Sequence, residues 1–197
     1  MSRVDISVGG IEVSGFTSID DMVDKAVYQG KEIVPGFAIA INPEKVLAAK
    51  ASEEVLSVLN SATIRFPDGV GVSYVMSKKA DAPIARIPGC ELWEAIMNAS
   101  TKFNTPVYLV GASPDVSSET SKKLTSIGVN VVGTQDGYFD SEREVIKQII
   151  KSRAKIVTVA LGSPRQELFI NKCREQYPDA FYMGVGGTYD VYTGDVK

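Results

Sequence analysis

The sequence predicts a Rossmann-like α/β protein with a mostly parallel sheet, helices on both faces and a small N-terminal β-hairpin. From residue 105 onward, apolar runs of six to eight residues alternate with stretches of helical length. These runs are apolar at successive positions, which is typical of strands that are buried on both faces. No long linker, low-complexity tract or block of like charges interrupts the chain, so we expect residues 1–197 to form one domain.

The first half of the chain carries clear turn and capping signals. Gly9 and Gly10 separate two short runs of alternating polarity, as in a β-hairpin. Ser18 is placed to cap a helix that starts with acidic residues and ends before Gly30. The other elements that we expect here are a strand at 36–42, helices at 43–50 and 53–62, a strand at 63–66, a helix start after 67–69, and a helix at 89–103.

The second half alternates strand and helix. We expect strands at 106–111, 129–134, 155–162 and 180–187, and helices at 115–128, 141–154 and 165–177. Two strand-to-helix junctions share the order Gly, Ser-Pro, helix, with Ser113 and Ser163 as the expected N-caps. Both helix N-termini then lie at the carboxyl edge of the sheet, where open α/β sheets bind ligands. Each junction is an ordinary capping sequence by itself, but two of them in one sheet favour a phosphate or diphosphate ligand.

Composition and charge exclude several classes of protein. The formal net charge is -3 and the pI is near 5.1, so we expect no nucleic-acid partner. No apolar run is long enough to cross a bilayer, and the N-terminus lacks the apolar core of a signal peptide. Cys90 and Cys173 are far apart in the sequence and form no metal-binding pair, which indicates a reduced, cytoplasmic protein.

The sequence contains no histidine. This excludes histidine general bases, Ser-His-Asp triads and most catalytic zinc sites. Proton transfer in an enzyme of this composition therefore depends on Asp or Glu, with Tyr, Lys or Cys less favoured. The chain has no GxGxxG fingerprint, no Walker lysine and no Asp-x-Asp pair. We therefore expect no NAD or ATP cofactor and no metal ion bound to a nucleotide diphosphate.

Polar residues follow several of the predicted strands or lie in loops beside them. They are Asn42, Asp68 in the Pro-Asp-Gly turn, Arg86 before the Gly89 helix, Gln166 with Glu167, and Asp190 after the glycine-rich run. Each also has an ordinary structural explanation, as a turn residue, a helix cap, a first-turn acid or a surface charge. Their shared position at one edge of the sheet favours a common site.

Several longer motifs occur together in the chain. They are INPEKVL, FPDGVGV, RIPGCELWE, VYLVGA, GTQDGYF, VALGSPRQE and YMGVGGTYDVYTGDVK. In this combination, from about residue 35 to the last residue, the chain resembles the WecG/TagA/CpsF glycosyltransferases. The motifs VTVALGSPRQELF and CREQYPDAFYMGVGGTYDVYTG resemble most the branch of the family that transfers N-acetyl-D-mannosaminuronic acid in enterobacterial common antigen synthesis.

The resemblance implies a metal-independent, inverting glycosyltransferase catalytic core that needs no cofactor. Its donor is a UDP-sugar, and its acceptor is N-acetylglucosamine linked to undecaprenyl diphosphate. The resemblance assigns the general base to Asp68. It also implies substrate contacts for Asn42, Arg86, Gln166, Gly111, Tyr138, Gly162, Gly186, Gly187 and Asp190.

The chain departs from the family in two respects. The teichoic-acid branch has threonine where this chain has Ala40, which fits a different donor sugar. A carboxylated sugar needs a cation, for which Arg86 and Arg165 are candidates. Family members continue past Lys197 into a basic segment that reaches the membrane and brings arginines over the diphosphate. We therefore expect a core without that segment, from a protein that is peripheral at the inner face of the cytoplasmic membrane, and the family favours a homo-oligomer.

The sequence leaves two alternatives open. One is transfer of N-acetylmannosamine from UDP in wall teichoic acid synthesis. The other is a module that binds nucleotide sugars without turning them over, as part of an assembly complex. The choice of donor separates the first alternative from the main hypothesis, and turnover separates the second.

Overall fold

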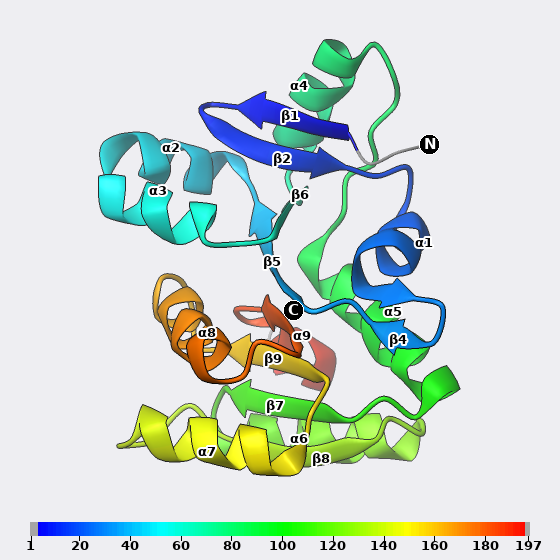
Figure 1. The fold of residues 1–197 in the computed structure, drawn as a ribbon, viewed down its shortest axis with the longest axis vertical. Coiled ribbons are helices and arrows are strands. Elements are labelled where there is room, and N and C mark those ends of the chain that lie inside the picture. Colours follow the sequence, from blue (N-terminus) through cyan, green and yellow to red (C-terminus); the bar gives the residue numbers. More distant parts are fainter. Residues whose placement is uncertain (1–3, 196–197) are drawn as a thin grey trace.

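The computed structural model describes residues 4–195 and contains the predicted parallel sheet (Figure 1). Within these residues, six strands form this sheet in the order β6-β5-β10-β9-β7-β8, and every neighbouring pair is parallel. Their bounds are Gly36–Ile41 for β5, Ile64–Pro67 for β6, Val107–Gly111 for β7, Val131–Gln135 for β8, Ile156–Ala160 for β9 and Phe181–Gly184 for β10. The predicted fold class is confirmed, and the last strand lies in the middle of the sheet.

The predicted N-terminal hairpin is also present. Its strands β1 (Val4–Val8) and β2 (Ile11–Gly15) pair antiparallel. Gly9 and Gly10 have φ angles of +61° and +90°, and positive values at both central residues are what a type I′ turn requires. Strand β2 packs beside β6, so the hairpin covers that end of the parallel sheet.

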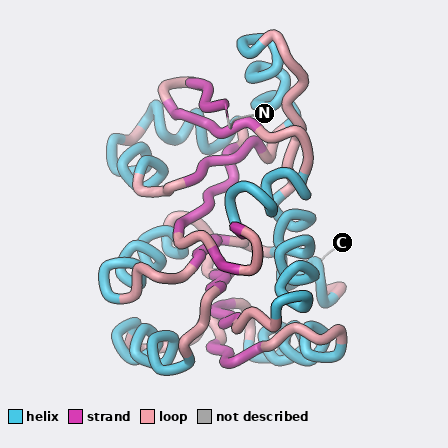
Figure 2. Tube along the Cα trace, turned by 45° about the vertical axis from the view of Figure 1, so that its right-hand side comes forward, coloured by secondary structure: helices cyan, strands magenta, loops and turns pink. Residues whose placement is uncertain are grey.

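Helices cover both faces of the sheet, and Figure 2 shows them on either side of the strands. One face carries α2 (Pro43–Ala51), α3 (Glu53–Asn60), α4 (Val70–Ala80), α7 (Glu142–Ser152) and α8 (Arg165–Gln176). The other carries α1 (Ile19–Met22), the π-helical turn η1 (Val23–Val27), α5 (Gly89–Phe103), α6 (Pro114–Ser126) and α9 (Thr188–Thr193). Along β5, Phe37 and Ile39 pack into one core and Ala38 into the other, as the period of a strand requires. No helix within residues 4–195 is both long enough and apolar enough to cross a bilayer.

The helix predicted after Ser18 is shorter than expected. The cap is confirmed, since the Asp21 N–H donates to Ser18 Oγ (3.0 Å), but the helix ends at Val27. Tyr28 is buried and its hydroxyl is hydrogen-bonded to Thr105, which holds the chain in an extended conformation. Strands β3 (Tyr28–Gln29) and β4 (Glu32–Ile33) follow as a small hairpin, and Gly30 lies in its turn instead of ending the helix.

One of the two predicted Ser-Pro caps is confirmed, and the other is wrong. The Val116 N–H donates to Ser113 Oγ (3.2 Å), and Pro114 is the first residue of α6. Helix α8 instead starts at Arg165, its N-cap is Pro164, and no side chain caps it. Because Pro164 is the N-cap, Ser163 lies one residue before the capping position.

Candidate active site

The polar residues predicted after β5 and β6 lie on adjacent loops at the carboxyl edge of the sheet. The two strands are neighbours, and Asn42 and Asp68 are the residues that follow them. The Asp68 N–H donates to the Ile41 carbonyl oxygen (2.9 Å). A Cβ at Gly69 would lie 2.7 Å from Cδ of Pro43, so this close approach of the loops needs a glycine. The fold therefore brings the loops that carry Asn42 and Asp68 close together.

The side chain of Asp68 is half-buried and reaches the start of α5. Its Oδ1 accepts a hydrogen bond from the N–H of Gly89 (3.2 Å), the first residue of that helix. The N-cap of α5 is Pro88, whose side chain cannot accept a hydrogen bond, so Asp68 satisfies a helix N–H from another loop. The positive end of the helix dipole also attracts a negative charge here. The contact thus stabilises the helix and holds a carboxylate at the edge of the sheet.

A cation lies directly beside Asp68. Arg86 is exposed, and its Nε donates to the backbone carbonyl oxygen of Asp68 (2.8 Å). The next residue, Ile87, is fully buried and donates its N–H to the Pro67 carbonyl oxygen (2.7 Å), which fixes the loop against the end of β6. Because the bond to Asp68 uses Nε, the terminal amino groups of the guanidinium can still donate to an anion. The structure therefore holds Arg86 against the backbone of Asp68.

Gln166 connects the start of α8 to the glycine-rich loop after β10. Its side chain is buried, and its Oε1 accepts a hydrogen bond from the Gly186 N–H (3.0 Å). Gly186 has a φ angle of +53°, which favours glycine, and a Cβ there would meet nothing within 4 Å. Gly187 is exposed next to it. The backbone of the loop is therefore accessible to a ligand, and the Gln166 side chain holds the loop from its buried side.

The glycines predicted at the other two junctions have different structural explanations. Gly111 is buried with a φ angle of +110°, and a Cβ there would lie 2.2 Å from the Ala160 carbonyl oxygen. The packing of β7 against β9 alone therefore accounts for this glycine. Gly162 is exposed beyond the end of β9, and a Cβ there would meet nothing within 4 Å. Of the two, Gly162 has a backbone that a ligand can approach.

Tyr138 lies at the opposite end of the same edge, after β8, and its side chain is 79% exposed. Arg165 is held in the same region, because its Nη2 donates to the Gly137 carbonyl oxygen (3.2 Å) and its guanidinium lies over the Phe139 ring. Strands in a sheet are about 4.8 Å apart, so the five spacings from β6 to β8 amount to about 24 Å. Tyr138 and Asp68 are therefore not brought together, and the predicted residues extend across the whole edge.

Asp190 lies half-buried on α9, a helix that the sequence analysis did not predict. Its neighbour Tyr189 anchors the helix: the side chain is fully buried, and its hydroxyl lies 2.6 Å from Thr158 Oγ1 and donates to the Thr158 carbonyl oxygen (3.0 Å). Burial raises the pKa of the Tyr189 phenol, so the side chain stays neutral. Tyr189 and Tyr192, three residues apart, both contact Trp93 of α5, and from this helical spacing the helix could have been predicted.

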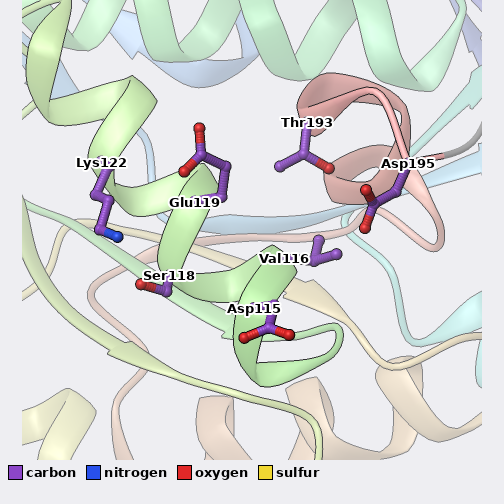
Figure 3. Close-up of a pocket in the computed structure, with 7 residues that line it drawn as sticks. All are labelled: Asp115, Val116, Ser118, Glu119, Lys122, Thr193 and Asp195. Atoms are coloured by element: carbon purple, nitrogen blue, oxygen red, sulfur yellow. The ribbon is translucent and has the colours of Figure 1, made fainter.

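A hollow of about 340 Å³ lies between α6 and the end of α9 (Figure 3). It is lined by Asp115, Val116, Ser118, Glu119, Lys122, Thr193 and Asp195. Three carboxylates against one lysine disfavour a diphosphate ligand. No group of three or more Cys, Asp or Glu side chains within residues 4–195 is arranged to hold a metal ion. None of the predicted site residues lines this hollow, so it is distinct from the predicted site.

The two cysteines are free and differ in accessibility. Cys173 is fully buried in α8, and burial raises its pKa to about 12. Cys90 is half-buried and follows Gly89, the residue that contacts Asp68. We therefore expect N-ethylmaleimide to modify Cys90 alone in the native protein and both cysteines in denaturant, as measured by mass spectrometry of peptides. Native labelling of Cys173 would contradict the packing of α8.

The site so described combines a carboxylate, a neighbouring cation and an open glycine-rich loop at one edge of an α/β sheet. A comparison with protein-family models matches residues 6–197 to the family described as "Glycosyl transferase WecG/TagA/CpsF family". The match includes most of the N-terminal hairpin, whereas the motifs in the sequence supported a resemblance only from about residue 35. The chain therefore belongs to the WecG/TagA/CpsF family and is a glycosyltransferase.

Proposed function

We propose that the protein transfers N-acetyl-D-mannosaminuronic acid from UDP to N-acetylglucosamine linked to undecaprenyl diphosphate, in enterobacterial common antigen synthesis. Family membership gives a glycosyltransferase with a sugar-nucleotide donor and a lipid-linked acceptor. The observation that carries the reaction is the pair of contacts that Asp68 makes. Its carboxylate accepts a hydrogen bond from the Gly89 N–H and its backbone carbonyl oxygen accepts one from Arg86, so both residues are held at the edge of the sheet. The choice of sugar rests on the motifs shared with that branch and on Ala40.

Asp68 is the proposed general base. Its Oδ1 is held by the Gly89 N–H, so the carboxylate has a defined orientation. It takes the proton of the acceptor hydroxyl while the hydroxyl oxygen forms a bond to the anomeric carbon of the donor sugar. The bond from that carbon to the UDP oxygen breaks at the same time, UDP leaves with the electron pair, and the configuration at the carbon inverts. A positioned base of this kind contributes about 10²–10⁴-fold to the rate.

The departing UDP and the sugar carboxylate are both anionic and need positive groups nearby. Arg86 is better placed than Arg165 to supply this positive charge. Arg86 is bonded to Asp68, whereas Arg165 is bonded to the loop after β8 and therefore lies toward the other end of the edge. The capped N-terminus of α6 and the backbone of Gly162 and Gly186 are the proposed contacts for the rest of the donor, with Tyr138, Gly187 and Asp190.

The acceptor sets the proposed location. Because the polyprenyl chain of the acceptor stays in a bilayer, we propose that the protein acts at the inner face of the cytoplasmic membrane as a peripheral protein. Self-association into a homo-oligomer is proposed from the family resemblance alone. Neither proposal changes the roles assigned to Asp68 and Arg86.

Calorimetric titration with UDP-N-acetylmannosaminuronic acid, UDP-N-acetylmannosamine and UDP tests the donor. We expect the uronic acid to bind about tenfold or more tightly than N-acetylmannosamine, since a charge-assisted hydrogen bond contributes about 1.5–3 kcal/mol. Arg86→Ala should remove most of this difference while UDP binding changes less.

Tighter binding of UDP-N-acetylmannosamine would contradict the donor assignment and favour teichoic acid synthesis. Binding of UDP-sugars without any transfer to a lipid-linked acceptor would contradict the enzymatic role and favour a binding module. The titration alone reveals the first outcome, whereas the second is seen only in a transfer assay with the lipid-linked acceptor.

A further inference from the structure

Glu167 is a buried carboxylate that the site described above does not use. It lies in the first turn of α8 and is 1% exposed. A buried carboxylate is costly unless it is paired and hydrogen-bonded. In the described part of the chain only its Oε1 has partners, and Oε2 is buried without one. The favourable interaction of an acid with a helix N-terminus does not explain this burial, because it is also available at the surface.

Two other segments, α2 and the loop after β10, are linked to Glu167. Its Oε1 accepts a hydrogen bond from Gln166 Nε2 (3.1 Å) and pairs with Lys45 Nζ (3.5 Å) of α2. The Gly186 N–H donates to the other end of the same amide, Gln166 Oε1 (3.0 Å). On α2, the Lys45 N–H donates to Oδ1 of Asn42 (2.9 Å). The contacts therefore connect the carboxyl ends of β5, β10 and β9, which are neighbours in the sheet.

The chemistry of these groups determines the orientation of the Gln166 amide. An ionised carboxylate can only accept hydrogen bonds, and a backbone N–H can only donate one. The amide must therefore direct Nε2 to Glu167 and Oε1 to Gly186. The flipped amide would set oxygen against the carboxylate and NH₂ against the N–H. Glu167 thus selects the amide orientation that holds the turn at Gly186.

We propose that Glu167 is a positioning residue for sugar transfer. Acting through Gln166 and Lys45, it holds the glycine-rich loop after β10 and the Asn42 end of α2 in one arrangement around the donor. A buried oxygen without a partner is the kind of local cost that proteins retain at functional sites. The identity of the donor rests on the proposed function, whereas the coupling between Glu167 and Gly186 does not.

Amide hydrogen exchange at Gly186, measured by NMR, tests the coupling, and calorimetric titration with UDP tests its consequence. Glu167→Ala removes the acceptor for Gln166, so we expect exchange at Gly186 to be about tenfold faster or more and UDP to bind about tenfold more weakly. Glu167→Gln keeps the shape and should give smaller changes in the same direction. Lys45→Met leaves the Gln166 contact in place and should affect Gly186 least of the three.

Glu175→Gln is the matched control, because Glu175 is exposed on the same helix and loses the same charge. It should leave both measurements unchanged. The amide of Val157, inside β9, reports on global opening and should keep its protection in every variant. If Glu167→Ala does not fold, Glu167→Gln decides the question.

Unchanged exchange at Gly186 and unchanged UDP affinity in the Glu167 variants would overturn the proposal. Equal loss of protection at Gly186 and Val157 would also overturn it, since this would show a role in overall stability alone. If the unmodified protein failed to bind UDP, the proposed function would fail, and exchange at Gly186 would still decide the role of Glu167.

Discussion

Replacement of Asp68 by asparagine is expected to lower sugar transfer by about 10²–10⁴-fold, which is the usual contribution of a general base. Asparagine has the same size, and its carbonyl oxygen can still accept the hydrogen bond from the Gly89 N–H. It cannot take a proton from the acceptor hydroxyl at neutral pH. The affinity for the UDP-sugar should stay nearly unchanged, because the lost interaction belongs to the transition state. The measurements are kcat with a lipid-linked acceptor and calorimetric titration with the donor.

Asp179→Asn provides the control for this substitution. Asp179 is exposed in the turn before β10, at the amino end of that strand and therefore at the opposite edge of the sheet, and it loses the same charge. We expect it to leave kcat unchanged. Turnover that survives in Asp68→Asn would refute the role of Asp68 as base. A comparable loss in Asp179→Asn would show that the effect comes from net charge instead of from the position of one carboxylate.

Trp93→Ala is expected to have the largest effect on stability, a loss of about 3–5 kcal/mol in the free energy of unfolding. Trp93 is fully buried on α5, and its Nε1 lies 3.4 Å from Oγ1 of Thr158. Its ring also packs against Tyr189 (5.6 Å between centroids) and Tyr192 (5.0 Å) of α9. The substitution therefore leaves a cavity where α5, β9 and α9 meet. Urea unfolding followed by circular dichroism measures the change.

Phe103→Ala on the same helix is the comparison for Trp93→Ala. Phe103 is 37% exposed at the last turn of α5, so its truncation should cost well under half as much. If Trp93→Ala cost less than about 1 kcal/mol, the packing of α9 on α5 described here would be wrong. The comparison also isolates the effect of burial, because both substitutions remove an aromatic ring from one helix.

The elements of the second half of the chain could be predicted because their signals are local. Continuous apolar runs mark β7 and β9, and both strands are fully buried on the two faces. The order of the strands could not be predicted, since β10 inserts between β5 and β9 through contacts far apart in the sequence. Helix α9 was missed because it is short and follows a glycine-rich run that is typical of a loop.

The candidate site could be predicted where it depends on strand ends. Asp68 and Asn42 follow neighbouring strands, and the general rule for parallel sheets is enough to bring them together. The link from Glu167 to Lys45 joins residues 122 positions apart, and it exists because α2 and α8 cover the same face of the sheet. The need for glycine at position 111 could not be predicted from any local pattern. It comes from the close approach of the Ala160 carbonyl group, which lies in a strand 49 residues later.

The mechanism requires that the acceptor hydroxyl, deprotonated by Asp68, displaces UDP in one step. The configuration of the anomeric carbon in the product, read from its NMR couplings after transfer to the lipid-linked acceptor, decides whether this happens. A single displacement predicts a configuration opposite to that in the UDP-sugar. A product with the configuration of the donor would contradict the mechanism. Retention requires either an intermediate between two steps or attack from the face that UDP leaves.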